Sequence, residues 1–255
     1  IALCAMFLAL AWILGYYVKT ESAHIEDIWK LANLDVLRDT YNHRCFYEIM
    51  SKLFEDDKNS EKPLSFLIID IDYFKNYNDI FGHQKGDNIL VKITDIIKET
   101  LTEKDYLCRY GGDDFAVIYC DTDRDAAMIR ANELREKVNR HKFYGQEMLP
   151  QGNLTISIGV CGRQDEDDTV RALIERADMA LYKAKCFRKN RVELYSSIFD
   201  RFTHLDAKSN ESMISIKSLI TIINSRDRYT YSHTERVVFY CEAFADYTCM
   251  SEDDR

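Results

Sequence analysis

The sequence predicts a mixed α/β domain in which helices pack on a sheet, and three observations carry this prediction. Amphipathic segments with helical spacing alternate with short apolar runs between residues 41 and 195. The run Leu64–Ile71 is almost continuously apolar, which is typical of a central strand buried on both faces. Two further short apolar runs flank a Gly-Gly pair, which predicts a β-hairpin.

The elements follow in the order α-β-α-β-β-α-β-α-β. Phe46, Ile49 and Met50 form one apolar stripe of the first helix, and Pro63 interrupts the chain before the first strand. The expected helices are Tyr41–Phe54, Ile89–Leu101, Asp125–Val138 and Thr169–Lys185. The expected strands are Leu64–Ile71, Tyr106–Tyr110, Phe115–Tyr119, Leu154–Val160 and Arg191–Tyr195. We place the whole domain at residues 35–197.

The N-terminal segment differs in kind from the rest of the chain. Ile1–Val18 contains no charged residue, and aromatic residues gather at its end before Lys19. As a helix it would extend roughly 27 Å, close to the hydrocarbon thickness of about 30 Å. We therefore expect residues 1–18 to be a transmembrane helix, the last of a longer membrane region, and residues 19–34 to be a connector helix. A buried core helix and a signal peptide are the alternatives.

Composition narrows the class of protein. The chain of 255 residues has a net charge of −9, with 46% hydrophobic and 30% charged residues, which indicates a globular fold. The negative charge argues against a general nucleic-acid binder, because phosphate backbones are held by clustered Lys and Arg. The eight cysteines include no CxxC pair, so we expect neither a disulfide framework nor a zinc site. A reducing compartment fits best.

Acidic residues follow the expected central strand and the expected hairpin tip. Asp70 and Asp72 lie at the end of the strand, where α/β proteins usually bind ligands. At the hairpin tip, Gly111 and Gly112 would let a ligand approach the backbone closely, and the acids that follow them could complete a divalent-metal site with Asp70. The alternative interpretation is an acid-capped strand end and an ordinary Gly-Gly hairpin with solvated acids.

A third polar group lies between these two motifs. The segments Phe74–Asp79 and Gly82–Asp87 carry Asn and Asp side chains that can read the edge of a base, because a carboxylate accepts two N–H groups of guanine. Lys75 could neutralise phosphate. Each residue alone is also an ordinary polar surface position.

In combination, these motifs resemble the GGDEF family of diguanylate cyclases. The chain has DIDxFKxxND, GHxxGD and RYGGDDF in the family's order and spacing. Supporting matches are Asp35, Leu37, Asn42 and Arg44 upstream, with Ser157–Val160 and Ala177–Lys185 downstream. The resemblance covers roughly Leu31 to Tyr195.

The resemblance implies a nucleotidyl-cyclase or polymerase-palm-like fold that condenses two GTP molecules into cyclic di-GMP and pyrophosphate. Each GTP is held by one protomer of a homodimer, in bacterial second-messenger signalling. The implied location is the cytoplasmic face of the inner membrane, anchored by the N-terminal helix. No nucleic-acid partner is implied.

The resemblance also assigns roles to residues. Asp70, the Ile71 carbonyl and Asp113 would hold Mg²⁺ or Mn²⁺, and Asp114 would lie near the attacking hydroxyl. By the same resemblance, Lys75 would stabilise transition-state charge, and Asn78 and Asp87 would bind guanine. The substrate would also contact the backbone of Gly111 and Gly112, and Lys185 and Lys189 would contact the distal phosphates. For the two helix-end lysines, a solvated basic terminus is the alternative.

Three departures from the family pattern bear on activity. Asp114 stands where the family usually has Glu, which retracts the carboxylate by about 1 Å. The family's inhibitory RxxD motif is reduced to Asp105, with Thr102 in place of Arg, so we expect no feedback inhibition through it. The loops Arg38–Asp39 and Arg188–Asn190 also differ from the usual pattern.

From residue 198 onward the sequence is helical in pattern and ends in an acidic stretch. The segment Ser225–Val237 resembles the opening of an HD-GYP phosphodiesterase domain, in which His233 would be a metal ligand. We therefore expect residues 198–255 to be the truncated start of such a domain. Two functions remain open: an active diguanylate cyclase, or a degenerate domain that binds GTP and regulates the phosphodiesterase. A cyclase for another nucleotide is disfavoured by Asp87.

Overall fold

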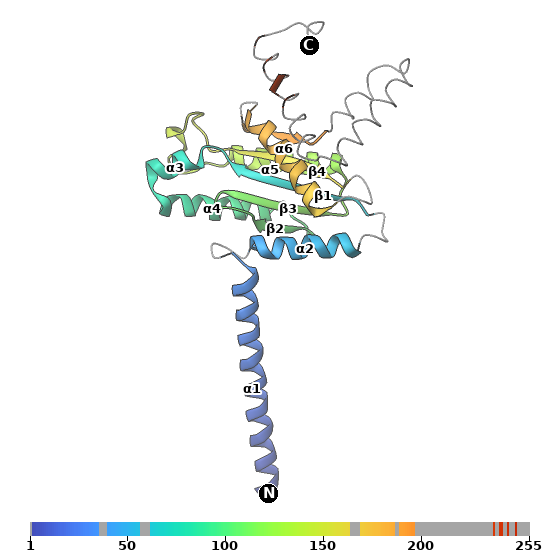
Figure 1. The fold of residues 1–255 in the computed structure, drawn as a ribbon. Helices are drawn as coiled ribbons and strands as arrows, with labels where there is room; N and C mark the ends of the chain where they lie inside the picture. Colours follow the sequence, from blue (N-terminus) through green and yellow to red (C-terminus); the bar gives the residue numbers. More distant parts are fainter. Residues whose placement is uncertain are drawn as a thin grey trace, which may run out of the picture.

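The computed structural model describes residues 2–35, 40–56, 62–163, 169–186 and 189–196, together with single positions between 237 and 248. Its centre is a five-stranded sheet in the order β2-β3-β1-β4-β5 (Figure 1). Only the β4–β5 pair is parallel. The strands are β1 (Leu64–Ile71), β2 (Tyr106–Arg109), β3 (Asp114–Cys120), β4 (Ile156–Gly162) and β5 (Val192–Leu194). The predicted hairpin, central strand and closing strand are confirmed.

Helices cover both faces of this sheet, as the sequence predicts. Every residue of β1 is buried, and its side chains alternate between two apolar clusters. Leu67 and Ile69 pack with α3 (Phe74–Phe81), α4 (His83–Lys98) and α5 (Arg124–Arg140). Phe66 and Ile68 pack on the opposite face with α2 (His43–Asp56) and α6 (Val170–Cys186). This double burial fixes the end of β1, and hence Asp70, in the middle of the domain.

One helical region differs from the prediction. The sequence suggested a single helix over Ile89–Leu101, but α4 begins at His83 and a separate helix, α3, precedes it. Phe74 and Tyr77 are buried one helical turn apart, so α3 has an apolar stripe that its polar motif residues conceal. Gly82, at φ +81°, separates the two helices with a backbone conformation that favours glycine.

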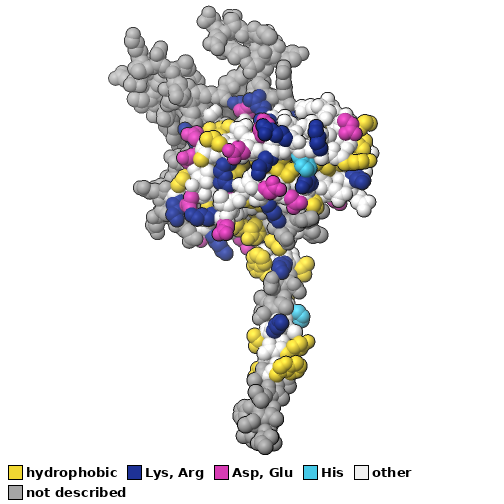
Figure 2. Space-filling model, turned by 180° about the vertical axis from the view of Figure 1, so that it is seen from behind, with side chains coloured by type: hydrophobic (Ala, Val, Ile, Leu, Met, Phe, Trp, Pro, Cys, Tyr) yellow, Lys and Arg dark blue, Asp and Glu magenta, His cyan; other side chains and the backbone are white. Residues whose placement is uncertain are grey.

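The N-terminal helix α1 (Ala2–Asn33) is continuous across the predicted span and the predicted connector, and it stands away from the sheet (Figure 1). Trp12, Tyr16 and Trp29 are among its exposed side chains. Figure 2 shows hydrophobic side chains along the surface of this helix. Within the residues that the structure describes, no helix is long and apolar enough to cross a membrane. The predicted transmembrane helix at residues 1–18 is therefore not supported, and most side chains of that segment lie outside the described part.

The predicted HD-GYP-like segment at residues 198–255 lies outside the described residues, apart from the few single positions between 237 and 248. This holds for His233 as well. On the face of the domain drawn in Figure 2, basic and acidic side chains are interspersed.

Candidate active site

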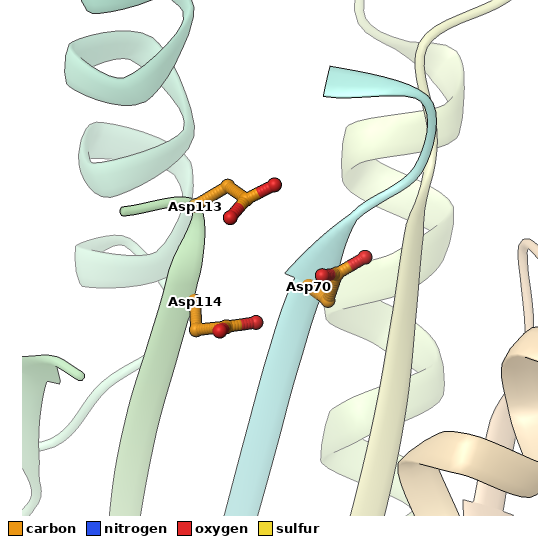
Figure 3. A group of neighbouring side chains, drawn as sticks. All are labelled: Asp70, Asp113 and Asp114. Atoms are coloured by element: carbon orange, nitrogen blue, oxygen red, sulfur yellow. The ribbon is translucent and has the colours of Figure 1, made fainter. Parts of the chain in front are cut away.

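Three carboxylates meet where β1 ends and β3 begins. Asp70 and Asp114 are direct partners in the antiparallel β1–β3 register, and Asp113 immediately precedes β3. Each residue offers an oxygen within 4.8 Å of the others, and Figure 3 shows the three side chains converging between the two strands. The predicted cluster of Asp70 with the acids of the hairpin tip is therefore formed.

The turn that carries Asp113 is held by backbone and side-chain hydrogen bonds. The amide groups of Tyr110 and Gly111 both donate to the Asp114 carbonyl, at 2.9 and 3.2 Å. Arg109 donates from Nη2 to the Gly112 carbonyl at 2.7 Å. From Nη1 the same guanidinium contacts Asp35, beyond the end of α1, at 2.9 Å. Arg109 thus connects the exposed glycine turn to the segment just after the C-terminal end of α1.

A lysine from the end of α6 reaches this cluster. Lys185 donates from Nζ to Oδ2 of Asp70 at 2.6 Å. The helix comes close enough because Gly159 of β4 has no side chain: a Cβ there would lie 2.1 Å from the Ala177 carbonyl oxygen of α6. The role of Lys185 at the distal phosphates stays a prediction, and the structure places its ammonium against Asp70.

Burial and mutual repulsion raise the proton affinity of the acids. Burial, together with the charges of Asp114 and Asp113, raises the pKa of Asp70 to about 7, although the Lys185 ammonium opposes this rise. Burial likewise raises the pKa of Asp114. Burial alone would lower the pKa of Lys185, but its hydrogen bond to Asp70 and the neighbouring acids outweigh burial and raise it.

This donor set fits a divalent cation. Hard cations such as Mg²⁺ and Mn²⁺ prefer oxygen ligands, and three carboxylates this close repel one another unless a cation or protons neutralise them. Ile71, the last residue of β1, has a buried side chain, so only its backbone could contribute a ligand.

Asp72 does not join the cluster, although the sequence places it at the same strand end. Its carboxylate is fully buried and accepts hydrogen bonds from the hydroxyls of Thr155 and Ser157, at 2.7 and 2.8 Å. It also accepts from the Asn190 amide at 2.9 Å. The sequence gives no direct sign of this network, because the direction in which an acid turns after a strand depends on the tertiary contacts it finds.

The base-reading candidates lie on α3 and α4. The Oδ1 atom of Asn78 is buried without a hydrogen-bond partner in the described part of the chain. A Cβ at Gly86 would lie 1.8 Å from this Oδ1, so glycine is required beside Asn78. Asp87 follows Gly86 and is exposed, and Lys75 is exposed on α3. An orphaned buried acceptor needs a donor, which a ligand can supply.

Lys189 lies apart from the three carboxylates. Its Nζ is 4.0 Å from Oδ1 of Asp72 and 4.5 Å from the centre of the Tyr73 ring. The two lysines that the resemblance assigns to phosphates are therefore held by two different acids, Asp70 for Lys185 and Asp72 for Lys189.

The remnant of the inhibitory motif is engaged inside the domain. The Asp105 side chain is fully buried and accepts from the amide and hydroxyl of Thr102, both at 2.8 Å. Arg130 forms an ion pair with the same carboxylate at 2.6 Å. Asp105, the residue just before β2, therefore connects this part of the chain to α5.

Comparison with known proteins identifies relatives of this site. The family profile described as "Diguanylate cyclase, GGDEF domain" matches residues 32–191. Diguanylate cyclase A of Treponema denticola is 39% identical over 155 residues, which cover 60% of this chain and 41% of that protein. The response regulator PleD of Caulobacter vibrioides is 39% identical over 166 residues, covering 64% of this chain and 36% of PleD. The chain thus spans less than half the length of these relatives.

Solved structures agree with the fold. The coiled coil and GGDEF domain of DgcB from Caulobacter crescentus, in complex with c-di-GMP, matches with a TM-score of 0.65 at 26% identity. That match covers 71% of this chain and 94% of the chain in that structure. The active GGEEF domain of a diguanylate cyclase from Vibrio cholerae matches with a TM-score of 0.57 at 30% identity, covering 61% of this chain and 97% of that domain.

Proposed function

Because the chain belongs to the GGDEF family of diguanylate cyclase domains, we propose that it condenses two GTP molecules into cyclic di-GMP and pyrophosphate. The observation that carries the proposal is the convergence of Asp70, Asp113 and Asp114 on one point. Curated relatives named as diguanylate cyclases support the same activity. In the proposal the reaction takes place in the cytoplasm.

The proposed reaction is phosphoryl transfer, carried out twice. The 3′-oxygen of one GTP attacks the α-phosphorus of the other, the bond from that phosphorus to the bridging oxygen breaks, and pyrophosphate leaves. A divalent cation bound by Asp70 and Asp113, with the Ile71 carbonyl, would neutralise phosphate charge and acidify the attacking hydroxyl. Asp114, whose pKa is raised by burial, is suited to accept the hydroxyl proton.

The remaining side chains position the nucleotide. Asn78, with its unpartnered Oδ1, and Asp87 would hold the guanine edge, as carboxylate and amide oxygens accept its N–H groups. Lys185 would neutralise phosphate charge beside Asp70, and Lys75 would do so from α3. Two such sites are needed for one cyclic product, so the proposal requires a homodimer whose two sites face each other.

A second candidate function rests on one departure. Asp114 carries one methylene fewer than the Glu usual in this family, and misplacement of a catalytic group by about 1 Å can cost about 10²-fold in rate. A chain that binds GTP but turns it over poorly would act as a regulatory module for the HD-GYP-like segment that we expect after residue 198.

One experiment separates the two functions. The full chain is incubated with GTP and Mn²⁺, and cyclic di-GMP and pyrophosphate are quantified by chromatography. We expect both products, and we expect Asp113→Asn to abolish them at unchanged fold. GTP binding without cyclic product would contradict the cyclase and support the module.

A further inference from the structure

Asp72 is a fully buried carboxylate that has no role in the proposed reaction. It lies directly after β1, and both of its oxygens accept hydrogen bonds, from the hydroxyls of Thr155 and Ser157 and from the Asn190 amide. A buried charge is costly unless it is paired and hydrogen-bonded. Here the donors come from Thr155 just before β4, from Ser157 within β4, and from the turn after α6, so the acid joins three separate parts of the chain.

The turn after α6 is strained, and it is held from two sides. Lys189 and Asn190 have φ of 60° and 48°, in the left-handed region that residues other than glycine rarely adopt. Asp72 binds the turn through the Asn190 amide. On the other side, the Asn190 side chain accepts from Arg135 at 3.0 Å and donates to Asn139 at 3.3 Å, both on α5.

This turn determines where the Lys189 ammonium lies. Its Nζ is 4.0 Å from Asp72 Oδ1 and 4.5 Å from the centre of the Tyr73 ring. Tyr73 immediately precedes α3, the helix that carries Asn78. The ammonium is therefore held between the end of the metal-binding strand and the start of the base-reading helix, although its own residue follows α6.

We propose that Asp72 is a positioning residue that directs Lys189 toward the phosphates of the bound nucleotide. Asp72 touches no substrate and acts through the turn that it anchors. The inference rests on the proposed function, because it takes GTP as the ligand. The two acids of the Asp70-Ile71-Asp72 segment then have different roles. Asp70 binds the cation and contacts Lys185, whereas Asp72 pairs with Lys189.

An isosteric change isolates the effect. In Asp72→Asn the side chain loses its negative charge and one of its two accepting oxygens becomes an amide nitrogen that can only donate. Lys189 therefore loses its anionic partner, and the turn retains at most one acceptor. Binding is measured with the full chain and Mg²⁺, using GTP with a methylene group between the α- and β-phosphorus, which blocks cleavage. Guanosine, which has no phosphates, is the second probe.

We expect Asp72→Asn to weaken binding of the GTP analogue about 10-fold, equivalent to about 1.4 kcal/mol, and to leave guanosine binding unchanged. In a Lys189→Ala background, Asp72→Asn should cause no further loss, because both changes remove the same interaction. Asn132→Ala is the matched control: Asn132 lies on the same helix, α5, and its side chain donates to the Met128 carbonyl, so the ratio of the two affinities should stay at the wild-type value.

A second variant covers the case in which Asp72→Asn does not fold. Asn190→Gly tolerates the left-handed backbone and removes the side-chain hydrogen bonds to Arg135 and Asn139, so the hold on the turn from α5 is weakened. It should weaken binding of the GTP analogue by less than Asp72→Asn does, and it should leave guanosine binding unchanged.

The outcomes are distinguishable. Equal losses for guanosine and the analogue, or losses that add in the Lys189→Ala background, overturn the inference. The inference is also overturned if Lys189→Ala weakens binding of the GTP analogue but Asn190→Gly leaves that binding unchanged. Failure of the wild-type chain to bind the analogue overturns both the inference and the proposed function, whereas analogue binding without cyclic product from GTP overturns only the latter.

Discussion

Lys185 donates a 2.6 Å hydrogen bond to Asp70, so an ammonium from the end of α6 lies against the carboxylate that is buried at the end of β1. Despite this partner, burial raises the pKa of Asp70 to about 7 from its ordinary value of 3.8. The desolvation of the acid therefore outweighs the attraction of the lysine. A divalent cation at the cluster would supply the missing positive charge.

The first prediction concerns stability against pH without metal. Between about pH 4 and pH 7 the folded chain keeps a proton on Asp70 that the unfolded chain has released, so the folded state loses stability as pH rises through this window. Relative to Asp70→Asn, the wild-type free energy of unfolding should fall by on the order of 4 kcal/mol and level off above about pH 7. Urea unfolding in the presence of a chelator measures the difference.

The control for this prediction is the cation itself. Mn²⁺ binds the deprotonated carboxylates, so adding it should stabilise the wild-type chain most at high pH and should stabilise Asp70→Asn much less. A difference between the two chains that stays flat from about pH 4 to about pH 8 would show that burial does not govern the proton affinity of Asp70.

The second prediction concerns the length of one side chain. Asp114→Glu moves the carboxylate forward by about 1 Å, toward the position usual in the family, and should raise kcat about 10-fold or more. KM for GTP should change little, because Asp114 is proposed to act on the attacking hydroxyl. Asp114→Asn, which keeps the volume and removes the charge, should give no cyclic product. A lower kcat in Asp114→Glu would mean that this chain's turn is already fitted to the shorter acid.

The hairpin and the central strand were predictable because their signals are local. Two apolar runs around Gly111 and Gly112 specify a hairpin, and an apolar run that ends in Asp70 specifies a buried strand end. Their combination places Asp70 opposite Asp114 once the strands are adjacent. The metal cluster therefore required only one tertiary assumption, that the hairpin pairs with the central strand.

The unpredicted features depend on contacts distant in sequence. α3 is not evident from the sequence because polar residues such as Lys75 and Asn78 alternate with its short apolar stripe. The task of Asp72 depends on Asn190, which reaches it only after α6 has packed on β4. In the same way, nothing near Asp105 in the sequence indicates that Arg130 of α5 would pair with it.

The third prediction follows from that last pair. Cyclic di-GMP should not inhibit the chain through Asp105, because the carboxylate is buried and already engaged by Thr102 and Arg130. Asp105→Asn should leave the response to added product unchanged and lower the free energy of unfolding by about 3 kcal/mol, since Arg130 loses its partner. Non-competitive inhibition by product that disappears in Asp105→Asn would contradict this.

The fourth prediction concerns the link between α1 and the glycine turn. Arg109 contacts Asp35 and the Gly112 carbonyl with two different nitrogens of one guanidinium. Arg109→Lys keeps the charge but has a single ammonium, so it cannot hold both partners in this geometry. We expect kcat to fall about 10-fold while guanosine binding stays unchanged. Lys104→Ala, which removes a surface ion pair with Asp121, is the control and should leave kcat unchanged.

The fifth prediction tests the base-reading residues separately from the metal cluster. A Cβ at Gly86 would lie 1.8 Å from Asn78 Oδ1, a distance that no relaxed structure tolerates, so Gly86→Ala must displace the Asn78 amide. Guanosine binding should weaken about 10-fold, since a hydrogen-bonded edge of the base loses its partner. The displacement should act on Asn78 alone, so Gly86→Ala in an Asn78→Ala background should cause no further loss of guanosine affinity.

Gln84→Ala is the matched control for this change, because Gln84 is an exposed residue of the same helix and its replacement should leave guanosine binding at the wild-type value. The metal site offers a second comparison, since Mn²⁺ should stabilise Gly86→Ala as much as it stabilises the wild-type chain. Isothermal titration with guanosine and thermal unfolding with Mn²⁺ give the two measurements. Unchanged guanosine affinity in Gly86→Ala would remove Asn78 from the base site, whereas a loss of both guanosine binding and Mn²⁺ stabilisation would indicate that the substitution disturbs the whole domain.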